Sequence, residues 1–293
     1  MSVVPDYNEL ARLLRMCEDA RFDSAWLMDH LTWGPNSAVF ECWTTLSALS
    51  RETSKIRLGP FFLCNSYRNP ALVAKMAATL DVISGGRLEL GMGAGWKKDE
   101  YRAYGYAFPS AAERIQRLDE AAAIIKLMWS SNPATFEGKY YKVSDAICRP
   151  EPLQSGGPPL WIGGGGEELT LRVAAKYADA CNFSGESTSL QTFQKKLSTL
   201  RRHCESVGRR IEDITKSVTL ELVLGKNEEQ AREMEREAPP SLTLERRFVG
   251  TPSGCVSLLE QFIDAGASYF MLHIEDLLPS LDLFENEVMP SFQ

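Results

Sequence analysis

The chain has 293 residues, a length that one β/α barrel with an insertion would fill. Hydrophobic residues make up 44% of it and charged residues 24%, which is typical of a globular protein and excludes disordered and collagen-like chains. The net charge of −7, without a basic run, argues against nucleic acid or an anionic membrane surface as the main partner.

Several kinds of segment and site are also excluded. No apolar stretch approaches the roughly 18 residues of a membrane span, and the first residues show no signal peptide. The seven cysteines are scattered, without a Cys-x-x-Cys pair, which argues against a disulfide framework or a zinc site. With three histidines and no His-Glu-x-x-His motif, we expect no bound metal and a cytoplasmic protein with reduced thiols.

Helical and strand patterns alternate along the chain. The first part predicts a helix at 8–21, a strand at 24–29, a helix at 41–52, a strand at 56–64, a helix at 70–83, a strand at 87–92, and helices at 97–104 and 112–129. Segment 130–159 is rich in Pro, Gly and polar residues, with a hairpin-like stretch at 135–141, and we interpret it as an insertion. Strands follow at 160–163, 180–184, 216–224 and 269–274, with helices at 167–176, 190–207, 228–237 and 253–265.

Strands separated by helices imply a parallel sheet with right-handed crossovers, which a doubly wound sheet and a closed barrel both satisfy. The length and the number of strands favour a single α/β domain over 1–293, a (β/α)8 barrel of the TIM-barrel type. Seven strands are convincing. The first is short or missing, because only Ser2-Val3-Val4 precedes Pro5 and a helix expected to begin near Tyr7 or Asn8. A barrel short of a strand exposes an edge and core residues, which predicts a homodimer.

Candidate site residues follow the strands at their carboxyl ends, where both architectures place their sites. His30 can accept or donate a proton near neutral pH, and Asp29 can orient it or a ligand. The alternative for His30 is a residue that only bonds to the backbone at the end of the strand. Phe61 and Phe62, next to Pro60, either wall a planar cofactor or fill the core.

Two glycine-rich turns are further candidates. The turn Gly91-Met92-Gly93-Ala94-Gly95-Trp96 lets a backbone approach a ligand closely, but it lacks the dinucleotide-binding pattern and is otherwise a tight turn. The run from Gly163 to Gly166 precedes the helix expected at 167. Its backbone N–H groups suit a phosphate, although Glu167 and Glu168 weaken the positive field there, and the alternative is a flexible turn.

In nearly its whole length the chain resembles the luciferase-like monooxygenase superfamily, especially its branch of oxidoreductases that depend on the deazaflavin coenzyme F420. The matching segments, in order, are FDSAWLMDH (22–30), RLG (57–59), YRNPALVAK (67–75), TLDVISGGR (79–87), GMGAGW (91–96), YRAYG (101–105), WIGGGG (161–166) and VGTP (249–252). An ordered series of this kind is far more specific than any one motif.

The resemblance implies a β/α barrel with the cofactor ring across the carboxyl-end mouth. It places Asp29 and His30 beside the ring, with His30 as the catalytic residue that assists hydride transfer. It places Phe61-Phe62 where the family has a cis peptide bond without proline. The other cofactor-binding residues that it implies are Cys64, Ala94, Gly95, Trp96, Asp99, Gly164, Gly165 and Gly166.

The function that this resemblance implies is hydride transfer between coenzyme F420 and a small organic substrate that the sequence does not identify. Sugar-phosphate dehydrogenases of this branch carry a glutamate proton donor where this chain has Trp96. We therefore expect a hydrophobic substrate or reductive chemistry more than sugar-phosphate oxidation. Two alternatives stay open: a monooxygenase of the same fold that uses flavin mononucleotide (FMN), and a degenerate barrel that binds a cofactor without catalysis.

Overall fold

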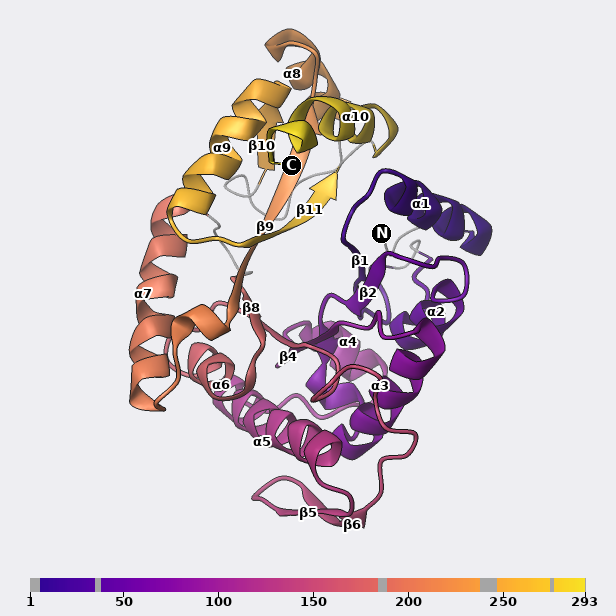
Figure 1. The fold of residues 1–293 in the computed structure, drawn as a ribbon, viewed down its shortest axis with the longest axis vertical. Helices are drawn as coiled ribbons and strands as arrows, with labels where there is room; N and C mark the ends of the chain where they lie inside the picture. Colours follow the sequence, from indigo (N-terminus) through magenta and orange to yellow (C-terminus); the bar gives the residue numbers. More distant parts are fainter. Residues whose placement is uncertain (1–5, 35–37, 184–188, 238–246, 275–276, 293) are drawn as a thin grey trace. The chain divides into compact units, whose positions relative to one another are not determined.

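The computed structural model describes residues 6–34, 38–183, 189–237, 247–274 and 277–292 (Figure 1). The chain divides into two compact units. The first unit consists of residues 1–163 and 172–179, and the second consists of residues 164–171 and 180–293.

The first unit alternates helices with parallel strands. Its elements are α1 (Tyr7–Asp19), β1 (Ser24–Leu27), α2 (Cys42–Leu49), β2 (Arg57–Pro60), β3 (Leu63–Cys64), the 3₁₀ turn η1 (Asn65–Tyr67), α3 (Pro70–Ser84), β4 (Leu90–Gly93), α4 (Lys98–Ala103), α5 (Ala111–Ser130), β5 (Ala134–Glu137), β6 (Lys142–Ala146) and β7 (Leu160–Gly163). Strand β1 pairs with β2, β3 with β4, and β4 with β7, all in parallel, whereas β5 and β6 form an antiparallel hairpin. The parallel pairing agrees with the pattern of alternation in the sequence.

The second unit is built around one long strand. Helix α6 (Thr170–Tyr177) begins in this unit and ends in the first. The elements that follow are β8 (Ala180–Asn182), α7 (Leu190–Ser206), η2 (Ile211–Asp213), β9 (Thr215–Leu224), α8 (Glu228–Glu237), β10 (Arg247–Gly250), α9 (Pro252–Asp264), β11 (Tyr269–Ile274), α10 (Leu277–Leu283), a π turn (Phe284–Val288) and a 3₁₀ turn (Met289–Phe292). Strand β9 pairs in parallel with β8, β10 and β11.

Local sequence signals fix the ends of several helices. The Asp6 side chain accepts hydrogen bonds from Asn8 N and Glu9 N at the start of α1. Helix α3 begins with Pro70 in its first turn, where a missing N–H costs nothing, and it ends at Gly85 with a left-handed φ of 71°.

Arg87 ties together the amino ends of β2 and β4, away from the carboxyl ends where the site is expected. It is buried, and its Nε donates to Ser84 O at 2.7 Å. Its Nη1 donates to Ile56 O (2.7 Å) and Thr53 Oγ1 (3.1 Å), and its Nη2 donates to Ser50 O (2.6 Å) and Thr53 O (3.1 Å). The guanidinium therefore donates to four carbonyl oxygens and one hydroxyl, from the ends of α2 and α3 and the loop before β2.

Most predicted elements occur near their expected positions, and α1 begins at Tyr7 as expected, whereas Ser2-Val3-Val4 lies outside the described residues. The predicted strand 56–64 is divided into β2 and β3 at Phe61-Phe62. The strand predicted from Arg87 begins only at Leu90, because Arg87 closes the turn after α3. Helix α6 begins at Thr170 rather than 167, since residues 167–169 form a turn. Strand β10 and helix α10 were not predicted.

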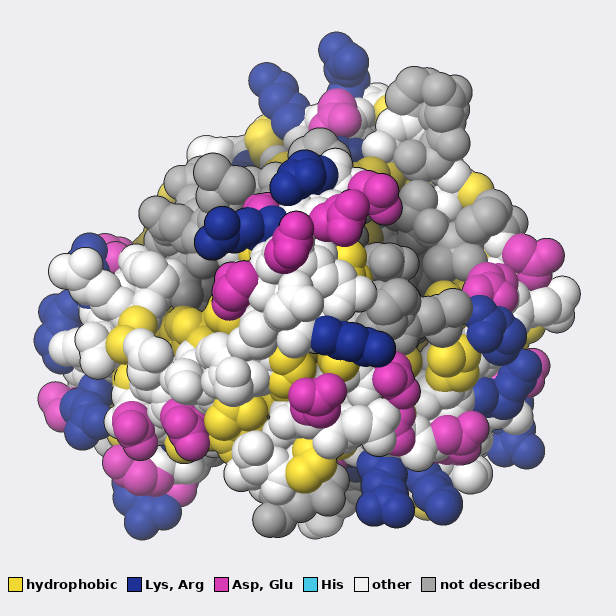
Figure 2. Space-filling model, turned by 90° about the horizontal axis from the view of Figure 1, so that it is seen from above, with side chains coloured by type: hydrophobic (Ala, Val, Ile, Leu, Met, Phe, Trp, Pro, Cys, Tyr) yellow, Lys and Arg dark blue, Asp and Glu magenta, His cyan; other side chains and the backbone are white. Residues whose placement is uncertain are grey.

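The structure gives three further findings on possible partners and ligands. On the face seen in Figure 2, acidic and basic side chains are interspersed. Within the described ranges, no helix is long and apolar enough to cross a membrane, and no group of three His, Cys, Asp or Glu side chains could hold a metal ion.

Candidate active site

Asp29 is a buried carboxylate that orders the carboxyl ends of β1 and β3. It is 4% exposed, and its two oxygens accept hydrogen bonds from Arg68 Nη1 (2.8 Å) and Nη2 (2.9 Å). The Oδ2 atom also accepts from Cys64 N at 2.8 Å. Burial by itself lowers the pKa of Arg68, but the hydrogen bonds and charge of Asp29 outweigh it and raise that pKa above its ordinary value. Asp29 therefore joins the end of β1 to β3 through the N–H group of Cys64, and to Arg68 through a bidentate ion pair.

His30 faces a second buried carboxylate, Glu100 in the first turn of α4. The Nδ1 atom of His30 lies 3.1 Å from Oε1 and 3.1 Å from Oε2 of Glu100. The His30 side chain is 14% exposed and that of Glu100 only 1%. This pair is the part of the site that sequence reasoning missed, because nothing in the helical pattern of 97–104 marks Glu100 as buried.

Three further donors surround the Glu100 carboxylate. Its oxygens accept from Thr32 N (3.2 Å), Tyr67 Oη (3.1 Å) and Lys97 Nζ (3.3 Å). Burial raises the pKa of Glu100, but the hydrogen bond and charge of His30, with Thr32 N and Lys97, lower it below its ordinary 4.5. Glu100 is therefore ionised at neutral pH and acts only as an acceptor.

Aromatic rings flank the imidazole. The ring centroid of His30 lies 4.7 Å from that of Trp33 and 5.7 Å from that of Trp96, both edge to face. Lys97 Nζ lies 5.1 Å from the centroid of Trp33 and donates to Thr32 O at 2.6 Å. The ammonium group is thus already occupied by neighbouring groups, and the exposed surface beside His30 is aromatic, with Trp96 63% exposed.

The predicted cis peptide bond is present between Phe61 and Phe62. The Phe62 ring lies against two glycines of neighbouring strands. A Cβ atom on Gly91 would meet Phe62 Cδ1 at 2.5 Å, and one on Gly163 would meet Phe62 Cδ2 at 2.4 Å. The absence of side chains at both positions makes the space for this ring.

Cys64 is a buried thiol in contact with Tyr101. Its Sγ lies 3.0 Å from Tyr101 Oη, and burial raises its pKa to about 11, which leaves it protonated at neutral pH. Gly95 has a φ of +79°, and a Cβ atom there would meet Cys64 Sγ at 2.5 Å and Tyr101 Oη at 2.1 Å. Ala94 O accepts from Tyr101 Oη at 3.4 Å. The turn after β4 therefore packs directly on the loop after β3.

An unsatisfied acceptor lies directly after Cys64. Asn65 is 3% exposed, and its Nδ2 donates to Tyr141 Oη at 3.3 Å. Its Oδ1 is buried and has no hydrogen-bond partner within the described residues. A buried amide oxygen in this state suits a donor from a bound molecule.

The remaining predicted cofactor residues are Asp99, next to Glu100 in α4, and the glycines from Gly164 to Gly166. Asp99 is exposed, and its carboxylate lies 3.8 Å from Lys97 Nζ. Gly164, Gly165 and Gly166 belong to the second unit. There Gly164 N donates to Asn182 O (3.3 Å) and Gly166 O accepts from Leu171 N (3.1 Å). The N–H group of Gly164 is therefore already used within the fold.

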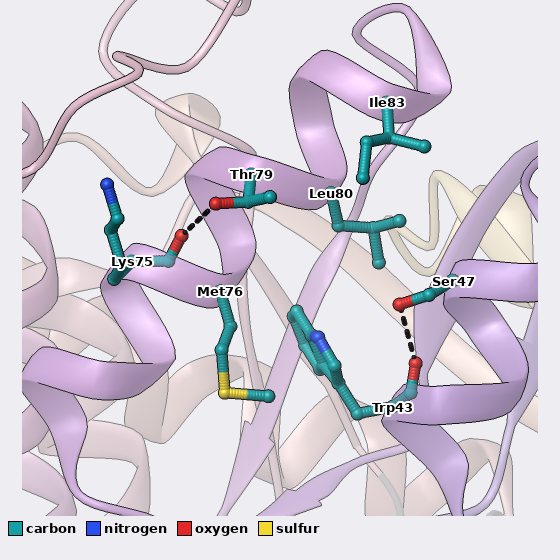
Figure 3. A pocket seen from close by; sticks show the side chains of 7 residues that line it. All are labelled: Trp43, Ser47, Lys75, Met76, Thr79, Leu80 and Ile83. Atoms are coloured by element: carbon teal, nitrogen blue, oxygen red, sulfur yellow. Dashed lines mark hydrogen bonds between the residues drawn. The ribbon is translucent and has the colours of Figure 1, made fainter.

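A pocket of about 210 Å³ lies elsewhere in the first unit, between helices α2 and α3 (Figure 3). Trp43 and Ser47 line it from α2, and Met76 and Leu80 from α3. None of the predicted site residues lines it, so it is separate from the cluster around His30.

Comparisons with known proteins identify the family to which the chain is similar. A family model described as luciferase-like monooxygenase matches residues 2–247. The F420-dependent glucose-6-phosphate dehydrogenase of Kineococcus radiotolerans is 30% identical, over 97% of this chain and 92% of its own. The enzyme of the same name from Microbacterium testaceum is 32% identical, over 94% of this chain and 84% of its own.

Solved structures share the fold at lower identity. A coenzyme F420-dependent tetrahydromethanopterin reductase from Methanopyrus kandleri covers 100% of this chain and 98% of its own, with a TM-score of 0.83 and 22% identity. An F420-dependent secondary alcohol dehydrogenase, solved with an F420-acetone adduct, covers 100% and 96%, with a TM-score of 0.85 and 21% identity. These likenesses confirm the predicted luciferase-like β/α-barrel class.

Proposed function

Because this chain belongs to the luciferase-like monooxygenase family, we propose that it is a coenzyme F420-dependent oxidoreductase that moves a hydride between the cofactor and a small organic substrate. The names of its relatives support the cofactor, since the two sequence relatives and the two solved structures named above are F420-dependent enzymes. Two observations in this chain carry the proposal: His30, which follows β1 and is held by the buried carboxylate of Glu100, and the Phe61-Phe62 cis peptide bond, which follows β2.

The residues present fit a planar deazaflavin. Phe61 and Phe62 supply an aromatic surface, and Asn65 Oδ1 is a buried acceptor that an imide N–H of the ring can satisfy. In the first unit, Cys64, Ala94 and Gly95 would hold the ring edge. In the second unit, Gly165 and Gly166 are glycines whose N–H groups suit a phosphate. When bound, the cofactor supplies the hydride chemistry.

The protein then has three tasks around the substrate. Asp29 fixes the loop that carries Cys64 and Asn65. His30 holds or releases the proton of the reacting oxygen, a role worth roughly 10²–10⁴-fold in rate. Trp33 and Trp96 offer the substrate an aromatic surface beside His30.

For the substrate we favour an apolar alcohol or its ketone. Trp33 and Trp96 flank His30, and the nearby ammonium of Lys97 is occupied by Thr32 O and Glu100. Trp96 also stands where sugar-phosphate dehydrogenases of this branch have a glutamate. The second candidate is glucose 6-phosphate, which the names of the relatives favour.

Titration of the apoprotein with F420 and with FMN, followed by fluorescence quenching, tests the cofactor. Saturable binding of F420 and none of FMN is expected; the reverse result would make the protein an FMN-dependent monooxygenase. Reduction of F420 is then measured with glucose 6-phosphate and with a series of secondary alcohols. Turnover only with glucose 6-phosphate would overturn the apolar substrate, and tight binding without any turnover would favour the degenerate barrel.

We also propose that the chain forms a homodimer in the cytoplasm. All seven cysteines are buried, unpaired thiols, which suits a reducing compartment. Sedimentation of the protein at micromolar concentration should give twice the mass of one chain, and a stable monomer would contradict the dimer.

A further inference from the structure

The function proposed so far uses Glu100 only as the carboxylate that holds His30, although its side chain is only 1% exposed. A carboxylate that is 1% exposed costs free energy unless its oxygens are satisfied. Here they are satisfied by Thr32 N, Tyr67 Oη, Lys97 Nζ and the imidazole of His30. Donors from the turn before α4, from the segment after β1 and from η1 therefore surround the Glu100 carboxylate, which lies beside Nδ1 of His30.

The chemistry of these donors determines where the His30 proton is. An ionised carboxylate accepts hydrogen bonds and donates none. Both Glu100 oxygens lie 3.1 Å from His30 Nδ1, so this nitrogen must carry hydrogen. The Nε2 atom, on the far side of the ring, then has its lone pair available whenever the ring is neutral.

We propose that Glu100 is the positioning residue of the site, which fixes His30 as the Nδ1–H tautomer and leaves Nε2 as the atom that exchanges a proton with the substrate. This inference rests on the proposed oxidoreductase function. In the direction of oxidation, the O–H bond of an alcohol breaks, its proton moves to Nε2, and the C–H hydride passes to the oxidised cofactor as the C=O bond forms. The imidazolium so produced faces the negative charge of Glu100, and the reverse direction returns the same proton to the oxygen.

Other titratable side chains also lie beside the His30–Glu100 pair. Lys97 faces Glu100 from the turn before α4, with Asp99 3.8 Å from its ammonium. Tyr67 faces Glu100 from η1. Because Lys97 and Tyr67 both donate to Glu100, neither competes with His30 as a proton acceptor.

The first test needs neither cofactor nor substrate. Long-range ¹H–¹⁵N spectra of the apoprotein distinguish the two neutral tautomers of each of its three histidines, and His30→Ala assigns the signal. Wild type should show the Nδ1–H pattern for His30. In Glu100→Gln the amide offers both an acceptor and a donor, so both tautomers are satisfied and a mixture is expected.

Tyr67→Phe is the matched control. It removes one donor to the same carboxylate but does not touch His30, so the tautomer should stay as in wild type. An Nε2–H pattern in wild type, or a tautomer that does not change in Glu100→Gln, would overturn the inference. Melting temperatures of both variants show that the comparison is made on folded protein.

The second test is kinetic. Glu100→Gln should lower kcat about 100-fold or more with a small change in KM, because the Nε2 lone pair is lost in part of the molecules and the imidazolium loses its counter-charge. Equal kcat in wild type and Glu100→Gln would refute the positioning role. A protein that fails to bind or reduce F420 while keeping the Nδ1–H tautomer would refute the proposed function and not the geometry of this pair.

Discussion

Replacing Gly91 by Ala should displace the Phe62 ring and destabilise the protein. The added Cβ would lie 2.2 Å from Pro60 O and 2.5 Å from Phe62 Cδ1, whereas ordinary contacts begin at 3.4 Å. The Phe62 ring and the backbone at Pro60 must therefore both move away from residue 91, or β4 itself must shift, by about 1 Å. Overpacking of a well-filled core costs about 1–3 kcal/mol, and contact with a backbone atom puts Gly91→Ala at the upper end, about 3 kcal/mol.

Gly93→Ala is the matched control, two residues further along the same strand. Its Cβ would meet nothing closer than 3.7 Å. The substitution should leave stability unchanged or raise it by about 0.4–1 kcal/mol, since alanine restricts the unfolded chain.

Thermal unfolding of the two variants and wild type measures the difference. At roughly 2–4 °C per kcal/mol, Gly91→Ala should melt about 6–12 °C below wild type. Its affinity for F420 should fall about tenfold or more, because Phe62 is part of the proposed ring surface. A Gly91→Ala protein that melts and binds like Gly93→Ala would refute the close packing of Phe62 on β4.

Three further outcomes follow from the ion pairs and thiols of the site. Arg68→Met leaves the buried Asp29 without its cation and should cost about 3–5 kcal/mol in unfolding free energy, whereas Arg117→Met, in a half-exposed pair with Glu113, should cost less than about 1 kcal/mol. Because its neighbours lower the pKa of Glu100, its contribution to stability is complete above pH 4.5 and is lost as the pH falls through the lower folded pKa. The difference in unfolding free energy between wild type and Glu100→Gln should therefore shrink from about pH 6 to about pH 3; a constant difference would contradict this. Burial raises the pKa of the Cys64 thiol to about 11, so Cys64 should resist iodoacetamide at pH 8 in the native protein. It should react when the protein is unfolded in urea. Rapid labelling of Cys64 in the native protein, located by mass spectrometry, would show that the thiol is not buried.

The elements with strong periodicity could be predicted from the sequence. Helix α8 and strands β7 and β11 have the expected bounds, because helical spacing or a short apolar run bounded by turn residues defined each of them. Strand β10 was missed because it contains Arg247 and only two apolar residues, so its strand character depends on pairing with β9. Pairing between distant segments leaves no local pattern.

The candidate site was predictable only in part, for a related reason. Asp29, His30 and Phe61-Phe62 follow or interrupt apolar strands, so their place in the sequence pointed to the carboxyl ends. Glu100 and Arg68 lie in polar stretches, and only the folded chain shows that both are buried. Their function depends on partners about 40 to 70 residues away, which a single sequence does not reveal.

The network of Arg87 has a consequence for how this protein can diverge. Its hydrogen bonds to Ser50, Thr53, Ile56 and Ser84 secure the amino ends of β2 and β4 without any residue of the loop that carries Trp96. Trp96 itself is 63% exposed and takes no part in this network, so a substitution at this position meets little constraint from folding. Such a substitution would change the side chain beside His30, and with it the compounds that the proposed site accepts, while the hydrogen bonds at the amino ends of β2 and β4 stay intact.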